Sequence, residues 1–301
     1  MPEWIIEDGI GETRAALIDN GEIVEARVRR EGITPAGAIL DAKLVAVAPR
    51  VTVEAGGEQF LLPRGVSGIS EGGGLTVEVT REALGGTEPW KRGLARRTAE
   101  VPRAAPALAD GRPGTIDGWD DLLEDARNGL VPFEGGEIRI EPTAAMTMID
   151  VDGWLVSDRL AQTAAWAAAR AIRRLDIGGS IGIDFPTLQN KADRQKVDAI
   201  LESYLPRPFE RTAINGFGFV QVIRPRPRAS LIELVRDRAA FEARALLRRV
   251  GRAIGTVTVT AHPAVIAAIA DSWRERLERQ VGGAVTLSPD PSLAISAGHV
   301  H

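Results

Sequence analysis

The hydrophobic period changes once along this chain, and that change constrains the fold more than any other feature. Residues 1–97 alternate apolar and polar positions in short runs separated by Asn-Gly and Gly-Gly turns, which is typical of β-hairpins. Residues 119–289 alternate helix-period segments with short apolar runs, which favours mixed α/β units. Residues 98–118 are rich in Pro, Ala and Gly and show neither period, so they predict a linker. The sequence therefore predicts a multidomain protein of the α+β and α/β classes.

Each side of the linker divides further. We predict five segments: an N-terminal β piece at 1–34, an OB-type barrel at 35–97, the linker at 98–118, a mixed α/β core at 119–230 and a small α/β domain at 231–301. Helices are expected at 119–129, within 157–179, and at about 188–204, 231–251 and 263–280. Strands are expected at 180–185, around 216–224, at 255–261 and at 284–289.

Few kinds of side chain are available for chemistry. The chain has no cysteine, which excludes a disulfide, a zinc–thiolate site and a cysteine nucleophile, and it has only three histidines, two of them at the C-terminal end. Any chemistry must therefore come from carboxylates, hydroxyls, Lys and Arg. No apolar run approaches the roughly 20 residues of a membrane span, and the acidic first residues do not resemble a secretion signal. We expect a cytoplasmic protein with no membrane partner.

Charge is distributed unevenly, although the formal sum is only −4. Residues 1–86 carry 14 acids and 8 bases, whereas residues 191–252 carry 14 bases and 7 acids. A phosphate-binding surface would need such an excess of bases, but a solvated helix face produces the same count.

Two apolar runs end in acids. The stretch "MTMIDVDG", 146–153, contains Asp150 and Asp152, and "GGSIGIDF", 178–185, contains Asp184. Because open α/β sheets bind ligands beyond the carboxyl ends of their strands, we expect Asp150 and Asp184 to face each other there. Two carboxylates without a His or Cys neighbour suit a hard cation, Mg²⁺ or Mn²⁺. Such an ion would supply the counter-charge that grouped acids need and could hold a phosphodiester and activate water.

Ordinary structural roles are the alternative for these acids. Asp150 could lie in a turn, Asp184 could cap the helix after "FPT", and Asp152 could belong to an Asp-Gly turn. For Asp152 turn chemistry is the simpler interpretation.

The stretch "FGFVQVIRPRPRASL", 217–231, is the second candidate site. Alternating Arg and Pro favours an extended backbone that projects Arg224, Arg226 and Arg228 along one line, where each could grip a phosphate. A solvated edge protected by proline is the alternative. Phe217 and Phe219 could stack on bases, but their alternate positions in a strand favour the core. Trp90, Lys91 and Arg92, with Arg96 and Arg97, form a smaller basic and aromatic cluster at the end of the barrel.

Three stretches in this order, "EPTAAMTMIDVDG", "RAIRRLDIGGSIGIDF" and "INGFGFVQVIRPRPRASL", resemble the catalytic core of the RNase E/G family of bacterial endoribonucleases. The match is tight over about ninety residues and looser on both sides. The resemblance implies a DNase I-like core within 119–230, with RNase H-like parts at 1–34 and in the remainder of that core. It further implies that Asp150 and Asp184 hold Mg²⁺ at the scissile phosphate of single-stranded RNA, and that Asp152 replaces the Asn that supports the metal in the family.

The resemblance also suggests RNA contacts and two departures from the family. Lys91 and Arg92 lie where the family's barrel grips RNA; Phe60 is the only aromatic residue near that place, and Lys191 and Arg170 are further candidates for phosphate contacts. Only the linker at 98–118 stands where relatives insert a sensor of the RNA 5′ monophosphate, so we expect no 5′-end sensing. Without cysteine, the zinc that joins the family's protomers cannot be bound.

We therefore predict a Mg²⁺-dependent endoribonuclease that hydrolyses single-stranded RNA. The alternatives are a catalytically weak RNA-binding or scaffold protein that keeps the fold and, less favoured, a phosphodiesterase that acts on DNA. A homodimer joined without zinc through the strands at 255–261 and 284–289 is a further hypothesis.

Overall fold

The N-terminal strands form a small sheet together with part of the expected linker. In the computed structural model, which describes residues 1–85, 88 and 90–301, this sheet has the order β3-β2-β1-β9. Its strands are β1 (Glu3–Asp8), β2 (Glu12–Asp19), β3 (Glu22–Arg30) and β9 (Arg112–Pro113).

The expected linker at 98–118 is extended but packed along this sheet, because β9 pairs in parallel with β1 and because Leu108 and Ala109 are buried against Ala15. It does not form a free tether.

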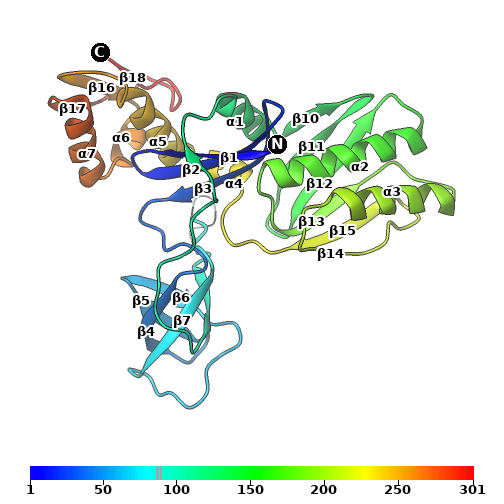
Figure 1. Cartoon of the computed structure of the whole chain (residues 1–301), viewed down its shortest axis with the longest axis horizontal. Coiled ribbons are helices and arrows are strands. Elements are labelled where there is room, and N and C mark those ends of the chain that lie inside the picture. Colours follow the sequence, from blue (N-terminus) through cyan, green and yellow to red (C-terminus); the bar gives the residue numbers. More distant parts are fainter. Residues whose placement is uncertain (86–87, 89) are drawn as a thin grey trace.

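The second unit is a closed five-stranded barrel of order β4-β5-β6-β8-β7. It projects away from the rest of the chain (Figure 1). The strands are β4 (Ile39–Ala46), β5 (Thr52–Ala55), β6 (Glu58–Leu61), β7 (Gly74–Arg81) and β8 (Gly93–Arg97). Inward-facing apolar residues alternate with exposed polar ones, as expected for a small barrel. Residues 86, 87 and 89, in the connection from β7 to β8, lie outside the described part of the predicted barrel segment.

The third unit is a six-stranded mixed sheet of order β10-β11-β12-β13-β15-β14. Only β12 and β13 pair in parallel; the other neighbours are antiparallel. The strands are β10 (Leu130–Phe133), β11 (Gly136–Pro142), β12 (Thr147–Gly153), β13 (Gly179–Asp184), β14 (Glu210–Arg211) and β15 (Phe219–Arg224). The helices of this unit are α1 (Trp119–Asn128), α2 (Ser157–Arg174) and α3 (Lys191–Tyr204). In Figure 1, α2 and α3 lie together against one face of the sheet.

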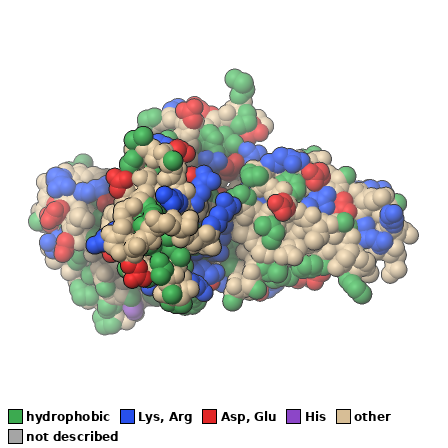
Figure 2. Space-filling view, turned by 90° about the horizontal axis from the view of Figure 1, so that it is seen from below, with side chains coloured by type: hydrophobic (Ala, Val, Ile, Leu, Met, Phe, Trp, Pro, Cys, Tyr) green, Lys and Arg blue, Asp and Glu red, His purple; other side chains and the backbone are tan. Residues whose placement is uncertain are grey.

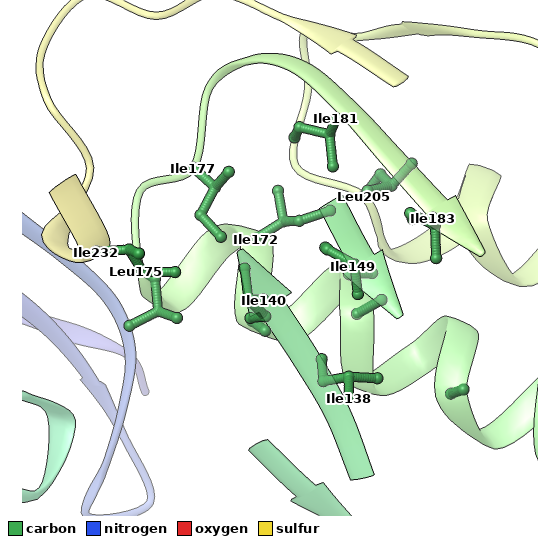
Figure 3. Packing of buried hydrophobic residues seen from close by; sticks show 14 of the residues in the cluster. Ile138, Ile140, Ile149, Ile172, Leu175, Ile177, Ile181, Ile183, Leu205 and Ile232 are labelled. Atoms are coloured by element: carbon green, nitrogen blue, oxygen red, sulfur yellow. The ribbon is translucent and has the colours of Figure 1, made fainter. Parts of the chain in front are cut away.

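Alternation in the strands decides which side chains enter the core. Ile138, Ile140, Ile149, Ile181 and Ile183 are fully buried, and Figure 3 shows them converging with Ile172 of α2. Since successive strand residues point to opposite faces, the strand residues next to these isoleucines lie on the face that α2 and α3 leave uncovered. Asp150 and Asp184 are two of them.

The alanine-rich sequence of α2 suits a helix between two sheets. One side of α2 contacts β10, β11 and β12, and another contacts β3 of the N-terminal sheet. Seven of its alanines are buried, and their small side chains allow both sheets to approach closely. The N-terminal strands and the mixed sheet therefore share one hydrophobic core.

The last segment forms a three-stranded sheet of order β17-β16-β18 with four helices. Its elements are α4 (Leu231–Arg236), α5 (Arg238–Val250), β16 (Val257–Ala261), α6 (Pro263–Ala267), α7 (Asp271–Val281), β17 (Val285–Pro289) and β18 (His299–Val300). The single helices predicted at 231–251 and 263–280 are each broken in two. In the first case, α4 packs in the core of the mixed sheet, whereas most of α5 packs in the separate C-terminal core, so the chain must turn between them at Asp237.

Two further observations bear on the partner predictions. β16 is the central strand of its sheet, paired with β17 on one side and β18 on the other, so only β17 keeps a long unpaired edge. Across residues 1–85, 88 and 90–301, no helix has both the length and the apolar character needed to cross a membrane.

Candidate metal and RNA site

Two carboxylates are brought together by the one parallel strand pair of the mixed sheet. β12 and β13 pair from Thr147 with Ile181 to Asp150 with Asp184, so the two acids are direct register partners. Strands in a sheet lie about 4.8 Å apart, and paired residues point to the same face. Both acids are exposed, on the face that the helices do not cover. The prediction that Asp150 and Asp184 lie side by side on adjacent strands agrees with this register.

Neither alternative structural role matches these positions. Asp150 lies within β12, which continues to Gly153, and not in a turn. Asp184 is the last residue of β13, whereas the N-cap of the following helix α3 is Asn190. The expectation that both strands end at their acids is thus correct for Asp184 and wrong for Asp150, because the antiparallel partner β11 extends the ladder beyond it.

The dyad belongs to a row of four paired residues across the open face. Arg139 of β11 pairs with Asp150, Asp150 with Asp184, and Asp184 with Phe219 of β15. The row therefore presents a cation, two anions and an aromatic ring in that order. Arg139 has an exposed side chain, and its only ion pair among the described residues is with Glu137 at 3.6 Å. Its guanidinium is free to interact with a ligand held by the acids.

The charges of the two acids are not neutralised within the described part of the chain. Neither carboxylate forms an ion pair or accepts a side-chain hydrogen bond there, and nowhere in that part do three or more His, Asp or Glu side chains gather as a metal-binding group. Two carboxylates are nevertheless enough for Mg²⁺, which keeps several waters and is commonly bound by one or two carboxylates together with substrate phosphate oxygens. The donor set of this face fits such an ion.

Asp152 lies one step further along the same face. It pairs with Glu137 of β11, and its carboxylate accepts a hydrogen bond of 2.8 Å from the backbone N–H of Gly153. Asp152 lies within β12, so the Asp-Gly turn considered from the sequence is not formed, and its side chain does not join Asp150 and Asp184 as a third ligand.

An apolar patch borders the dyad on its other side. A Cβ at Gly182 would lie 2.8 Å from the Phe219 ring and 2.9 Å from the sulfur atoms of Met146 and Met148. These three half-buried side chains therefore converge over the glycine, two strand residues before Asp184. The patch offers a surface on which the apolar part of a ligand can rest.

The three arginines of the "RPRPR" stretch are occupied within the molecule. Arg224 donates to the carbonyl oxygens of Pro206 and Ile177, Arg226 pairs with Glu233 and Glu88, and Arg228 pairs with Asp176 at 2.8 Å. The expectation that they project together toward a ligand is wrong. The Arg-Pro spacing is a local signal, whereas Glu88, Asp176 and Ile177 come from distant parts of the chain.

Arg226 and the neighbouring Pro227 connect the barrel to the core. Arg226 reaches Glu88 in the connection between β7 and β8, and the backbone N–H of Glu82 donates to the carbonyl of Pro227 at 2.8 Å. A pocket of about 250 Å³ opens at this seam, lined by Trp90, Lys91, Arg226 and Arg236 among others. Figure 2 shows Lys and Arg side chains gathered beside the barrel where it meets the mixed sheet.

The remaining predicted contacts divide into buried, paired and free side chains. Phe60 is fully buried in the barrel core, so the expectation that it meets RNA is wrong; its alternate strand position points inward. Arg170 pairs with Glu22 at 2.9 Å and lies over the Trp166 ring, behind the sheet. Lys91 pairs with Glu88 at 2.6 Å. Arg92 and Lys191 are exposed and have no side-chain partner among the described residues, and Lys191 begins α3, the helix that follows β13.

Much of the basic excess at 191–252 serves the interior. Arg248, which lines a cavity of about 1170 Å³ beside α1 and α5, pairs with Glu7 at 3.0 Å and with Glu12 at 3.5 Å. These pairs join the C-terminal domain to the acidic N-terminal third. The opposite charges of the two segments thus meet within the chain.

Sequence reasoning missed Arg139, and it placed Phe217 in the core although 83% of that side chain is exposed. Period-two alternation in "GEIRIEP" would have placed Arg139 opposite the buried Ile138 and Ile140. The exposure of Phe217 depends on a turn described below and has no comparable sequence signal.

Comparisons with known proteins single out the segment that carries this face. Residues 120–227 match the model of the Ribonuclease E/G family. The resemblance of the three motifs is thereby confirmed for this segment. Ribonuclease G of Escherichia coli (strain K12) is 37% identical over 109 residues, and Ribonuclease G of Salmonella typhimurium (strain SL1344) is 38% identical over the same length; each alignment covers 32% of this chain and 22% of the relative. Ribonuclease G of Haemophilus influenzae is 36% identical over 133 residues, 40% of this chain and 27% of the relative.

The matched part is thus 22% to 27% of each relative's length. It contains both acids of the dyad, Arg139 and Phe217.

Proposed function

We propose that this protein is a Mg²⁺-dependent endoribonuclease that hydrolyses phosphodiester bonds of single-stranded RNA. One observation carries the proposal: Asp150 and Asp184 are register partners on an uncovered sheet face, within the segment that matches the Ribonuclease E/G family. Two adjacent acids without an internal counter-charge are unfavourable in a folded chain unless a cation or substrate group compensates them.

Each residue of the row has a role in this proposal. Asp150 and Asp184 hold the ion, for which Mn²⁺ is an alternative. When bound, Mg²⁺ neutralises phosphate charge, orients the scissile group and lowers the pKa of a coordinated water. Arg139, next to Asp150, binds a phosphate oxygen through its guanidinium and fixes the register of the RNA backbone. Asp152, two residues after Asp150 in β12, would add negative charge to the site.

The finer architecture in the proposal is an OB-type barrel and a DNase I-like core. The OB-type barrel is supported by the closed strand order, in which β8 precedes β7. The DNase I-like core is supported by the mixed sheet, which has α2 and α3 on one face. Arg92 and Lys191, both free, supply the remaining phosphate contacts. The cytoplasm is the compartment we propose for this reaction.

We also propose that cleavage does not depend on a 5′ monophosphate. Residues 98–118 run along the N-terminal sheet and the barrel, with Arg103 bridging to Ile39, and form no folded unit of their own. A fluorescent RNA carrying either a 5′ phosphate or a 5′ hydroxyl tests this directly. Equal cleavage rates are expected, and a strong preference for the phosphate would contradict the proposal.

The decisive test of the main proposal uses a fluorescent single-stranded oligoribonucleotide with Mg²⁺ or with EDTA. We expect cleavage that requires the metal and is lost in Asp150→Asn and in Asp184→Asn. Asp110→Asn, which removes an exposed acid remote in sequence from the sheet, is the matched control and should cleave normally. Binding without turnover in the unaltered chain would favour the scaffold alternative, and equal cleavage of a deoxyribose oligonucleotide would favour the phosphodiesterase.

A further inference from the structure

Phe217 is an exposed aromatic residue in a turn next to the strand end that carries Asp184. It lies two residues before Phe219, the register partner of Asp184, in the turn that leads into β15. With 83% of its side chain accessible, it is among the most exposed large apolar residues of the described chain. Because so little of this ring is buried, it contributes little to the stability of the fold.

The turn around Phe217 is tightly built. The side-chain oxygen of Asn215 accepts hydrogen bonds from the backbone N–H groups of Phe217, at 2.9 Å, and Phe219, at 3.0 Å. Gly218 has φ of +96°, and a Cβ at this position would lie 2.1 Å from the carbonyl oxygen of Phe185. The backbone N–H of Phe185, directly after Asp184, donates to Gly218 at 3.1 Å. The turn is thus tied to the residue that follows the dyad.

We infer that Phe217 stacks on a base of the RNA next to the scissile phosphate. This inference rests on the proposed function, which places that phosphate at Asp150 and Asp184. Every nucleobase has a face that can stack on an aromatic ring, so such a contact is tolerant of sequence. Because the backbone that carries Phe217 is fixed by these hydrogen bonds before binding, it loses little conformational freedom when the base arrives. Phe217 is a positioning residue, since it touches the substrate base and not the reacting atoms.

A single-stranded RNA base is the occupant that the surroundings favour. The turn that carries Phe217 adjoins a face with the unneutralised acids, Arg139 and the patch of Phe219, Met146 and Met148. That combination of phosphate-binding and apolar groups matches a nucleotide better than an apolar peptide surface, which would have to cover the two acids. It also allows consecutive nucleotides to cross the open face with their bases on the Phe217 side.

The test is RNA binding in a chain that cannot cleave. Fluorescence anisotropy would measure the Kd of a 12-nucleotide RNA in the Asp150→Asn background, with Phe217→Ala, Phe217→Tyr or Ile254→Ala added. We expect Phe217→Ala to weaken binding about tenfold and Phe217→Tyr to restore it to within twofold. Ile254→Ala, which removes a side chain 94% exposed in the C-terminal domain, should have no effect. Because Phe217 is exposed, thermal unfolding should be unchanged in all three.

A second measurement locates the stacked base. Abasic sites are placed one at a time along the RNA. At one position next to the cleaved bond, the abasic site should weaken binding to the chain that keeps Phe217 about as much as Phe217→Ala weakens binding of the intact RNA. The two changes should not add, because each removes the same contact. Full additivity at every position, or a Phe217→Ala variant that binds normally, overturns the inference.

Failure of this inference is distinguishable from failure of the proposed function. Metal-dependent cleavage with binding indifferent to Phe217 overturns the stacking contact alone. Binding that depends on Phe217 in a chain that never cleaves supports the contact and overturns the endoribonuclease. Absence of RNA binding by the unaltered chain overturns both.

Discussion

The pair Asp150 and Asp184 makes a prediction about stability that does not require catalysis. Without metal, two charged carboxylates on adjacent strands repel each other, and Arg139 is shared with Glu137 at 3.6 Å. Replacing one acid by the isosteric amide, Asp184→Asn, removes the repulsion and keeps the shape. We therefore expect the variant to be more stable than the unaltered chain in EDTA.

The size of the effect follows from the strand spacing. Two unit charges about 5 Å apart repel by about 0.8 kcal/mol at the dielectric constant of water and by about 3 kcal/mol at an effective value of 20. Both side chains are exposed, so the lower figure applies, and Asp184→Asn should stabilise the metal-free chain by about 1 kcal/mol. Added Mg²⁺ reverses the order, because a ligand at 100 times its Kd stabilises the native state by about 2.7 kcal/mol.

Thermal and urea unfolding of both chains, with EDTA and over a Mg²⁺ titration, measure this crossover. Salt provides an internal check, since 1 M NaCl screens exposed charges and should shrink the advantage of the variant in EDTA. Asp110→Asn should show neither the gain nor the loss of Mg²⁺ response. If Asp184→Asn is less stable in EDTA, or if Mg²⁺ stabilises it as much as the unaltered chain, the two acids do not form a cation site.

Three more outcomes are expected. Arg139→Gln should raise KM for RNA about tenfold with a smaller change in kcat, measured by initial rates, whereas an unchanged KM would remove Arg139 from the phosphate contact. Burial raises the pKa of Glu82 from its ordinary value of 4.5, so the native state binds more protons than the unfolded state and Glu82 lowers the stability as the pH rises through that value. Urea unfolding from pH 4 to 7 should therefore show the unaltered chain losing stability relative to Glu82→Gln. A difference that stays constant with pH would contradict this. Phe60→Ala should destabilise the chain by about 3–5 kcal/mol, while Phe60→Leu should retain RNA affinity, which a base-stacking Phe60 would lose.

The sequence predicted the elements of the mixed sheet well because their signals are local. Helices α1 and α2, the strands around the acids and the closed barrel follow from periods of two and 3.6 residues that the final packing did not override. The broken helix at Asp237 was missed, since nothing within 231–251 shows that its two halves pack in different cores.

The sequence by itself limited the kinds of side chain available for chemistry and placed two acids in apolar runs. Without cysteine, and with no histidine near the motifs, two acids each after an apolar run leave hard-cation chemistry as the natural use, and a parallel strand pair brings them together. Only the tertiary structure decided which other side chains remain free for a ligand. Arg228 pairs with Asp176 and Arg226 with Glu88, and Phe217 is exposed although Phe60 is buried. Strand period is a property of neighbouring residues, whereas the availability of a long or aromatic side chain depends on distant segments that meet only in the folded chain.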